Sequence, residues 1–108
     1  MTMHMPEVTV QELEILLEDN SDLLLIDVRS YGEFELVNIG GVHIPLDELE
    51  HRLPEIDKSK DIYCLCHHGV RSQYAQSILL KSGAMKVYNI IGGIDAWSIH
   101  IDDSVSTY

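Results

Sequence analysis

The sequence predicts an α/β fold, with a mostly parallel central sheet of about five strands wrapped by helices on both faces. Short apolar runs alternate along the chain with segments whose apolar residues recur at helical spacing. The apolar run over residues 23–26 has no polar alternation, which is typical of a strand covered on both faces. No internal repeat or low-complexity segment interrupts the pattern, so we expect strands joined by crossover helices.

Four of these strands can be placed from their composition and from the turn residues that bound them. They cover residues 23–26, 42–44, 62–65 and 86–90. The first ends at Asp27, and the third leads directly into Cys66. Active sites in parallel sheets lie beyond the carboxyl ends of the strands. Cys66 is therefore expected at such a position.

The predicted helices begin and end at recognisable signals. Capping-box patterns at residues 9–12 and 30–33 predict the starts of two helices, the second carrying Phe34. A small amphipathic helix is expected to carry Leu46, Leu49 and Leu53, and to end near Pro54. The longest helix should follow residue 69 and end at a glycine cap, Gly83. A final helix is expected over residues 94–99.

Length and composition indicate one small globular domain, because the chain has 108 residues, 45% of them hydrophobic. We expect its core over about residues 8–99 and a polar, passive surface tail over residues 100–108. A docking role for this tail is the alternative. No apolar run approaches the roughly 18 residues of a membrane-spanning helix, and residues 1–6 do not resemble a secretory signal. We therefore expect no membrane contact and a cytoplasmic protein.

The net charge of −11 is unevenly distributed along the chain. Residues 1–66 hold fifteen acidic and four basic side chains, whereas residues 67–108 hold three of each. Nucleic acid is excluded as a partner, since phosphate binding requires clustered lysine and arginine. The acidity is interpreted as a contribution to solubility, and basic protein partners are the alternative.

The most informative segment is a loop between a strand and a helix. It reads Cys66-His67-His68-Gly69-Val70-Arg71-Ser72. Backbone N–H groups and the positive end of a helix dipole converge in such a loop. These surroundings favour a thiolate, which is the reactive nucleophile. Gly69 allows positive φ, and Arg71 either folds back to hold the loop or binds an oxyanion with its planar fork.

This loop resembles the active-site loop of single-domain rhodaneses, sulfurtransferases that carry sulfur as a cysteine persulfide. The resemblance covers roughly residues 8–97 in family order and spacing. Its further motifs are Asp27-Val28-Arg29, Glu33-Phe34, the segment from Ile39 to Leu46, Val87-Tyr88-Asn89 and Gly92-Gly93-Ile94-Asp95-Ala96-Trp97. Asn38 stands where the family often has histidine and Gly40 where it often has proline, in a loop remote in sequence from Cys66.

The resemblance implies a thiosulfate sulfurtransferase in which the Cys66 thiolate takes sulfur from thiosulfate or a persulfide donor. The Cys66 persulfide would then pass it to cyanide, a thiol or a protein cysteine, with a sulfur-relay protein as a candidate partner. N–H groups from His67 to Ser72 would stabilise the anionic sulfur. Asp27 would orient either Arg71 or Arg29. No metal or organic cofactor is required.

The two loop histidines each have two possible roles. His67 and His68 are either exposed loop residues or a source of pH-dependent positive charge near the sulfur. Arg71 is the only permanent cation of the loop. Many rhodaneses that use thiosulfate well have further basic residues there, so a protein-bound persulfide is an alternative donor.

Two other functions are compatible with this resemblance. Dual-specificity phosphatases and certain arsenate reductases share the fold and the cysteine-to-arginine loop, with one residue more between the two. Here four residues separate Cys66 from Arg71, and the shorter loop favours a single sulfur atom over a tetrahedral oxyanion. A non-catalytic binding domain is the other alternative. Inactive relatives commonly lack the cysteine, which is present here.

A structural zinc site is a further alternative, because Cys64-x-Cys66-His67-His68 is dense in soft ligands. We expect the two cysteines to point to opposite faces of their strand, which argues against a shared metal and against a disulfide. No second cysteine and histidine cluster completes four ligands. Cys64 is therefore expected to be a core residue, and unpaired cysteines are typical of a reducing compartment.

Overall fold

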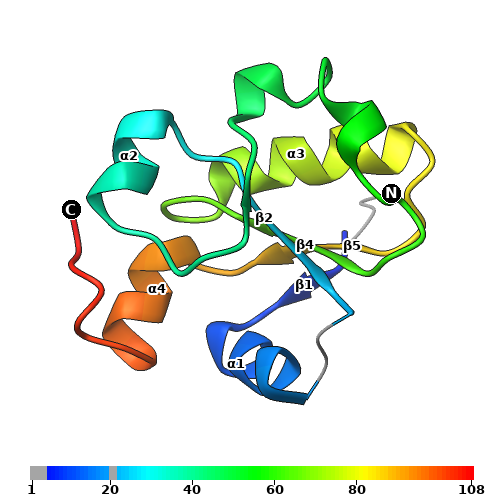
Figure 1. Ribbon diagram of the computed structural model, residues 1–108. Helices are drawn as coiled ribbons and strands as arrows, with labels where there is room; N and C mark the ends of the chain where they lie inside the picture. Colours follow the sequence, from blue (N-terminus) through cyan, green and yellow to red (C-terminus); the bar gives the residue numbers. More distant parts are fainter. Residues whose placement is uncertain (1–4, 20–21) are drawn as a thin grey trace.

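The computed structural model describes residues 5–19 and 22–108, which form a five-stranded sheet of parallel strands (Figure 1). The strand order is β1-β5-β4-β2-β3, and every neighbouring pair is parallel. The strands are β1 (Glu7–Val8), β2 (Leu24–Asp27), β3 (Val42–His43), β4 (Ile62–Leu65) and β5 (Val87–Ile90). The predicted fold class is confirmed. The expectation about a secretory signal falls partly on residues 1–4, outside the described residues.

In the part of the chain that the structure describes, four α-helices flank this sheet. They are α1 (Val10–Asp19), α2 (Tyr31–Leu36), α3 (Val70–Lys81) and α4 (Gly93–His100). Both predicted capping boxes form. The Thr9 hydroxyl accepts from the Glu12 N–H at 3.1 Å while the Glu12 carboxylate accepts from the Thr9 N–H at 3.0 Å. Ser30 and Glu33 make the same reciprocal pair at the start of α2.

The predicted helix around Leu46, Leu49 and Leu53 is wrong. The structure has two short 3₁₀ helices there, η1 (Leu46–Glu48) and η2 (Leu53–Glu55). The backbone hydrogen bonds of these two turns span three residues, as from the Glu48 N–H to the Pro45 carbonyl and from the Glu55 N–H to the Arg52 carbonyl. The leucine spacing still serves burial, since Leu49 is fully enclosed.

The sheet separates two hydrophobic cores, and β4 contributes to both. Ile62 and Cys64 face the core beneath α3, whereas Tyr63 and Leu65 face the core beneath α1 and α4. Figure 1 shows α3 on one side of the sheet and α1 with α4 on the other. The four strand residues are all buried, as expected for the central strand of a sheet covered on both faces.

Cys64 and Cys66 both belong to the core beneath α3, so the expectation that they point to opposite faces is wrong. Side chains of an extended chain alternate with a period of two, and residues two apart therefore share a face. Both thiols are free.

The C-terminal segment packs back onto the domain. Ile101 and Val105 contact the core beneath α1 and α4, and the Ser98 hydroxyl donates a hydrogen bond to the Val105 carbonyl. The chain then ends near α2 (Figure 1). Within the described ranges, no helix has the length and apolarity needed to cross a membrane.

Candidate active site

Cys66 lies at the carboxyl end of β4, immediately before the loop that opens α3. Its side chain is 1% exposed, and the Gly69 N–H points at the sulfur with 3.0 Å between N and Sγ. Gly69 has a φ of +105° and occupies the N-cap position of α3. The predicted positive φ is thus confirmed, and it lets the loop turn its N–H toward the sulfur.

The first turn of α4 holds the backbone on the other side of Cys66. The Ile94 N–H donates to the Cys66 carbonyl at 2.8 Å, and the Asp95 N–H donates to the His67 carbonyl at 3.2 Å. This approach requires glycine at residue 93. A Cβ on Gly93 would lie 2.3 Å from the Cys66 carbonyl oxygen, and its φ is +59°. The Gly92-Gly93 motif therefore fixes where the cysteine sits.

A buried polar group completes the surroundings of the sulfur. Ser72 Oγ lies 3.3 Å from Cys66 Sγ and donates to the amide oxygen of Asn89 in β5. The amide nitrogen of Asn89 donates to the Gly69 carbonyl at 3.1 Å. The sequence places Ser72 in the loop. It marks Asn89 only as part of a motif, because the role of Asn89 depends on β5 lying beside β4.

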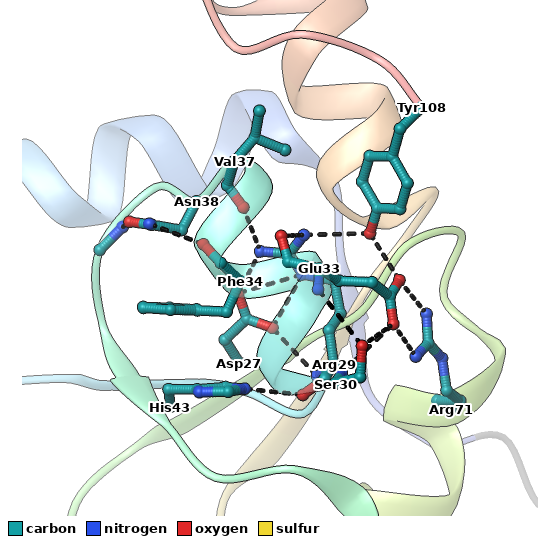
Figure 2. Close-up of polar contacts among 11 residues, drawn as sticks. Asp27, Arg29, Ser30, Glu33, Phe34, Val37, Asn38, His43, Arg71 and Tyr108 are labelled. Carbon is teal, nitrogen blue, oxygen red and sulfur yellow. Dashed lines mark hydrogen bonds and ion pairs between the residues drawn. The ribbon is translucent and has the colours of Figure 1, made fainter.

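Arg71 pairs with Glu33 of α2. Its Nη1 and Nη2 atoms lie 2.5 and 2.8 Å from the two carboxylate oxygens (Figure 2). The hydrogen bonds from Arg71 hold the pKa of Glu33 well below its usual range, and those same bonds raise the pKa of Arg71. Both groups stay charged across the physiological range. Of the two expected roles for Arg71, holding the loop is the one that this geometry fits.

Asp27 orients Arg29, one of the two partners expected for it. The pair is completely buried, with 2.7 Å between Arg29 Nη2 and Asp27 Oδ2. The same guanidinium donates to the Glu33 and Val37 carbonyls at 3.2 and 2.8 Å. Asp27 and Arg29 therefore fasten the segment around α2 and support the site through Glu33. Removing Asp27 would leave a buried cation unpaired, so Asp27→Ala is expected to unfold the domain rather than to report on catalysis.

Tyr108 joins these two ion pairs. Its hydroxyl accepts from Arg29 Nη1 at 3.0 Å and donates to Glu33 Oε2 at 2.7 Å (Figure 2). Its ring stacks on that of His67, with 3.9 Å between centroids and 6° between planes. The segment expected to be a passive tail thus contacts the loop beside Cys66. Nothing in the local sequence marks Tyr108 for this place.

The two loop histidines stack on each other, with ring centroids 3.8 Å apart. Burial, and secondly the charge of His68, lower the pKa of His67. This direction disfavours the protonated form of His67 and so disfavours a cationic role for it near the sulfur. With Asp95, the histidines place potential ligand atoms within 4.8 Å of one another. Among the described residues this group offers three ligand atoms, one fewer than a closed structural zinc site has.

The departures at residues 38 and 40 lie in the loop after α2. The Asn38 side chain donates to the Phe34 carbonyl and accepts from the Gly40 N–H, both at 3.0 Å (Figure 2). His43 stacks on Phe34 and bonds to the Arg29 carbonyl at 2.7 Å. This loop is held by its own side chains, and it contacts Arg29 through the Val37 carbonyl and the His43 ring.

Comparison with known proteins identifies the family. Residues 9–100 match the family described as the rhodanese-like domain. The chain belongs to this family. Two curated relatives of the rhodanese-like domain illustrate the match. GlpE of Coxiella burnetii, a thiosulfate sulfurtransferase, is 31% identical over 73% of this chain and 75% of its own length. YrkF of Bacillus subtilis is 36% identical over 86% of this chain and 51% of its own length.

The fold agrees with solved members of the family. The crystal structure of a rhodanese-like domain protein from Staphylococcus aureus superposes with a TM-score of 0.80 and 26% identity, covering 96% of this chain and 99% of that one. Some relatives are longer, since the chain spans only 51% of YrkF and 37% and 23% of relatives from Arabidopsis thaliana and Zea mays. The expected rhodanese resemblance is confirmed, and with it membership of a sulfurtransferase family.

Proposed function

We propose that this rhodanese-like domain is a sulfurtransferase that carries sulfane sulfur as a persulfide on Cys66. The observation that carries this proposal is the N–H of Gly69 aimed at Sγ across 3.0 Å, at the end of the central strand. A backbone donor in that place stabilises negative charge on sulfur. The thiolate is the nucleophile, and the loop from His67 to Ser72 is its cradle.

The chemistry divides one transfer into two displacements. The Cys66 thiolate attacks the outer sulfur of the donor, and a bond forms between Sγ and that sulfur. With thiosulfate as donor, its S–S bond breaks and sulfite leaves with the electron pair. In the second step an acceptor attacks the outer sulfur of the persulfide. The bond to Sγ breaks, the outer sulfur leaves on the acceptor, and the protein returns to its starting state with a Cys66 thiolate.

The donor can be thiosulfate or a persulfide, and the acceptor cyanide, a thiol or a protein cysteine. The pairing of Arg71 with Glu33 favours a persulfide donor over thiosulfate, because the one permanent cation of the loop is already neutralised. A pocket lined by Val28, Ser30, Pro45, Leu46, Asp47 and Arg71 is the proposed approach for the donor. A sulfur-relay protein in a reducing compartment such as the cytoplasm fits two free thiols.

The test is thiosulfate-dependent formation of thiocyanate from cyanide, measured for the wild type, Cys66→Ser and Cys64→Ser. Cys64 is the matched control because it lies two residues away in the same core. We expect Cys66→Ser to abolish turnover and Cys64→Ser to retain it. Turnover by Cys66→Ser would contradict the proposal. Hydrolysis of a phosphate ester that Cys66→Ser abolishes would favour phosphate chemistry instead.

A further inference from the structure

Four groups around the nucleophile form a closed ring of hydrogen bonds. The Gly69 N–H donates to Cys66 Sγ, which lies 3.3 Å from the Ser72 hydroxyl. Ser72 donates to the amide oxygen of Asn89, whose amide nitrogen returns to the Gly69 carbonyl at 3.1 Å. Ser72 is fully buried and Asn89 is 4% exposed, so water does not compete for these bonds.

The Gly69 carbonyl fixes the direction of this ring. A carbonyl oxygen only accepts, so the Asn89 amide must turn its nitrogen toward Gly69 and its oxygen toward Ser72. The amide oxygen also only accepts, and the single proton of the Ser72 hydroxyl is therefore committed to Asn89. What remains for the sulfur is a lone pair of Ser72, which accepts the S–H of a protonated Cys66.

A charge on Sγ changes this arrangement. A thiolate has no proton to give, and it gains a hydrogen bond from Ser72 only if the hydroxyl turns away from Asn89. This rotation leaves the buried amide oxygen of Asn89 without its donor. The free-energy cost of that unsatisfied acceptor disfavours the rotation. A thiol, or the uncharged inner sulfur of a persulfide, leaves the hydroxyl where it is.

We propose that Asn89 is a positioning residue for Cys66, which directs the Ser72 hydroxyl and so limits the negative charge that Sγ takes up. The hydroxyl stays on Asn89 while Sγ is uncharged and turns to Sγ when it is a thiolate. This inference rests on the proposed function only in taking Cys66 as the nucleophile.

The test is the pH profile of Cys66 alkylation by iodoacetamide, located by mass spectrometry. Alkylation reports the thiolate and requires no sulfur transfer, so it separates this inference from the proposed function. In Asn89→Ala the hydroxyl is free to serve the thiolate, and we expect alkylation in mild acid to be about tenfold faster than in the wild type. Ser72→Ala should be slower, because the thiolate loses its hydroxyl donor.

The double variant decides whether Asn89 acts through Ser72. With Ser72→Ala already in place, Asn89→Ala should no longer accelerate alkylation. The proposal is overturned if Asn89→Ala is no faster than the wild type, or if it accelerates alkylation equally with and without Ser72. Thermal unfolding of each variant identifies any that fails to fold, and Ser72→Ala then supplies the decision, since alkylation as fast as in the wild type would also overturn the proposal.

Discussion

Cys64 and Cys66 show how two residues of one type, two positions apart, acquire different chemistry. Burial raises the pKa of Cys64 to about 12, and the residue packs as a small apolar side chain. Cys66 lies in the same core but ends the strand, where the Gly69 N–H and the Ser72 hydroxyl reach its sulfur. These loop donors distinguish Cys66, which we propose as the nucleophile, from the core residue Cys64.

At the same scale, the pair between Glu33 and Arg71 predicts a pH-dependent stability. The pKa of Glu33 is lowered from 4.5, so its contribution is complete above that pH and is lost as the pH falls toward the lowered pKa. We expect Glu33→Gln to lower the free energy of unfolding by about 1 kcal/mol at neutral pH, since Arg71 is partly exposed and screened by water. The difference from the wild type should shrink in acid, as followed by urea unfolding.

Glu55→Gln is the matched control for this prediction. Glu55 also pairs with an arginine, Arg52 at 3.1 Å, but its side chain is 56% exposed. Its replacement should change the free energy of unfolding very little at any pH. Equal effects of the two substitutions, or a Glu33→Gln effect that persists unchanged below pH 4.5, would contradict the role given to Glu33.

At the scale of elements, the sequence predicts what local chemistry determines. Both capping boxes and the central strand over residues 62–65 follow from their own residues. Local sequence does not predict two other elements correctly. Strand β1 has two residues and exists because it pairs with β5. The segment from Leu46 to Glu55 keeps its leucine spacing, but it forms two short 3₁₀ helices in place of the small α-helix that the spacing predicts.

The C-terminal segment contacts the site through Tyr108, and substitutions of Tyr108 measure how much these contacts contribute to stability. Tyr108→Phe keeps the stack on His67 and removes the hydroxyl that bridges Arg29 and Glu33. We expect it to cost about 1 kcal/mol of unfolding free energy. Tyr108→Ala also loses the ring stack and should cost roughly 1 kcal/mol more. Urea unfolding measures both.

Tyr74→Ala is the control for the tail, because Tyr74 on α3 is 65% exposed. It should leave the urea midpoint nearly unchanged. If both Tyr108 variants have the same urea midpoint as Tyr74→Ala, the segment is the passive tail that the sequence predicts. Its contacts with the site then contribute nothing to the free energy of unfolding.

At the scale of the whole molecule, the site combines one contiguous loop with distant supports. The residues from Cys66 to Ser72 are adjacent in sequence, and their motif identifies them. Glu33 comes from α2, Asn89 from β5 and Tyr108 from the C-terminal segment. The order of the parallel strands and the packing of the C-terminal segment back onto the domain bring these groups to one end of the sheet. A single sequence holds no local signal for that meeting.

The central claim is that Cys66 carries sulfur, and intact mass after incubation with thiosulfate or a polysulfide tests it most directly. We predict that the wild type and Cys64→Ser each gain the mass of one sulfur atom, which a reductant removes and cyanide converts to thiocyanate. Cys66→Ser should gain nothing. A sulfur gained by Cys66→Ser, or no gain by the wild type with any donor, would contradict the claim.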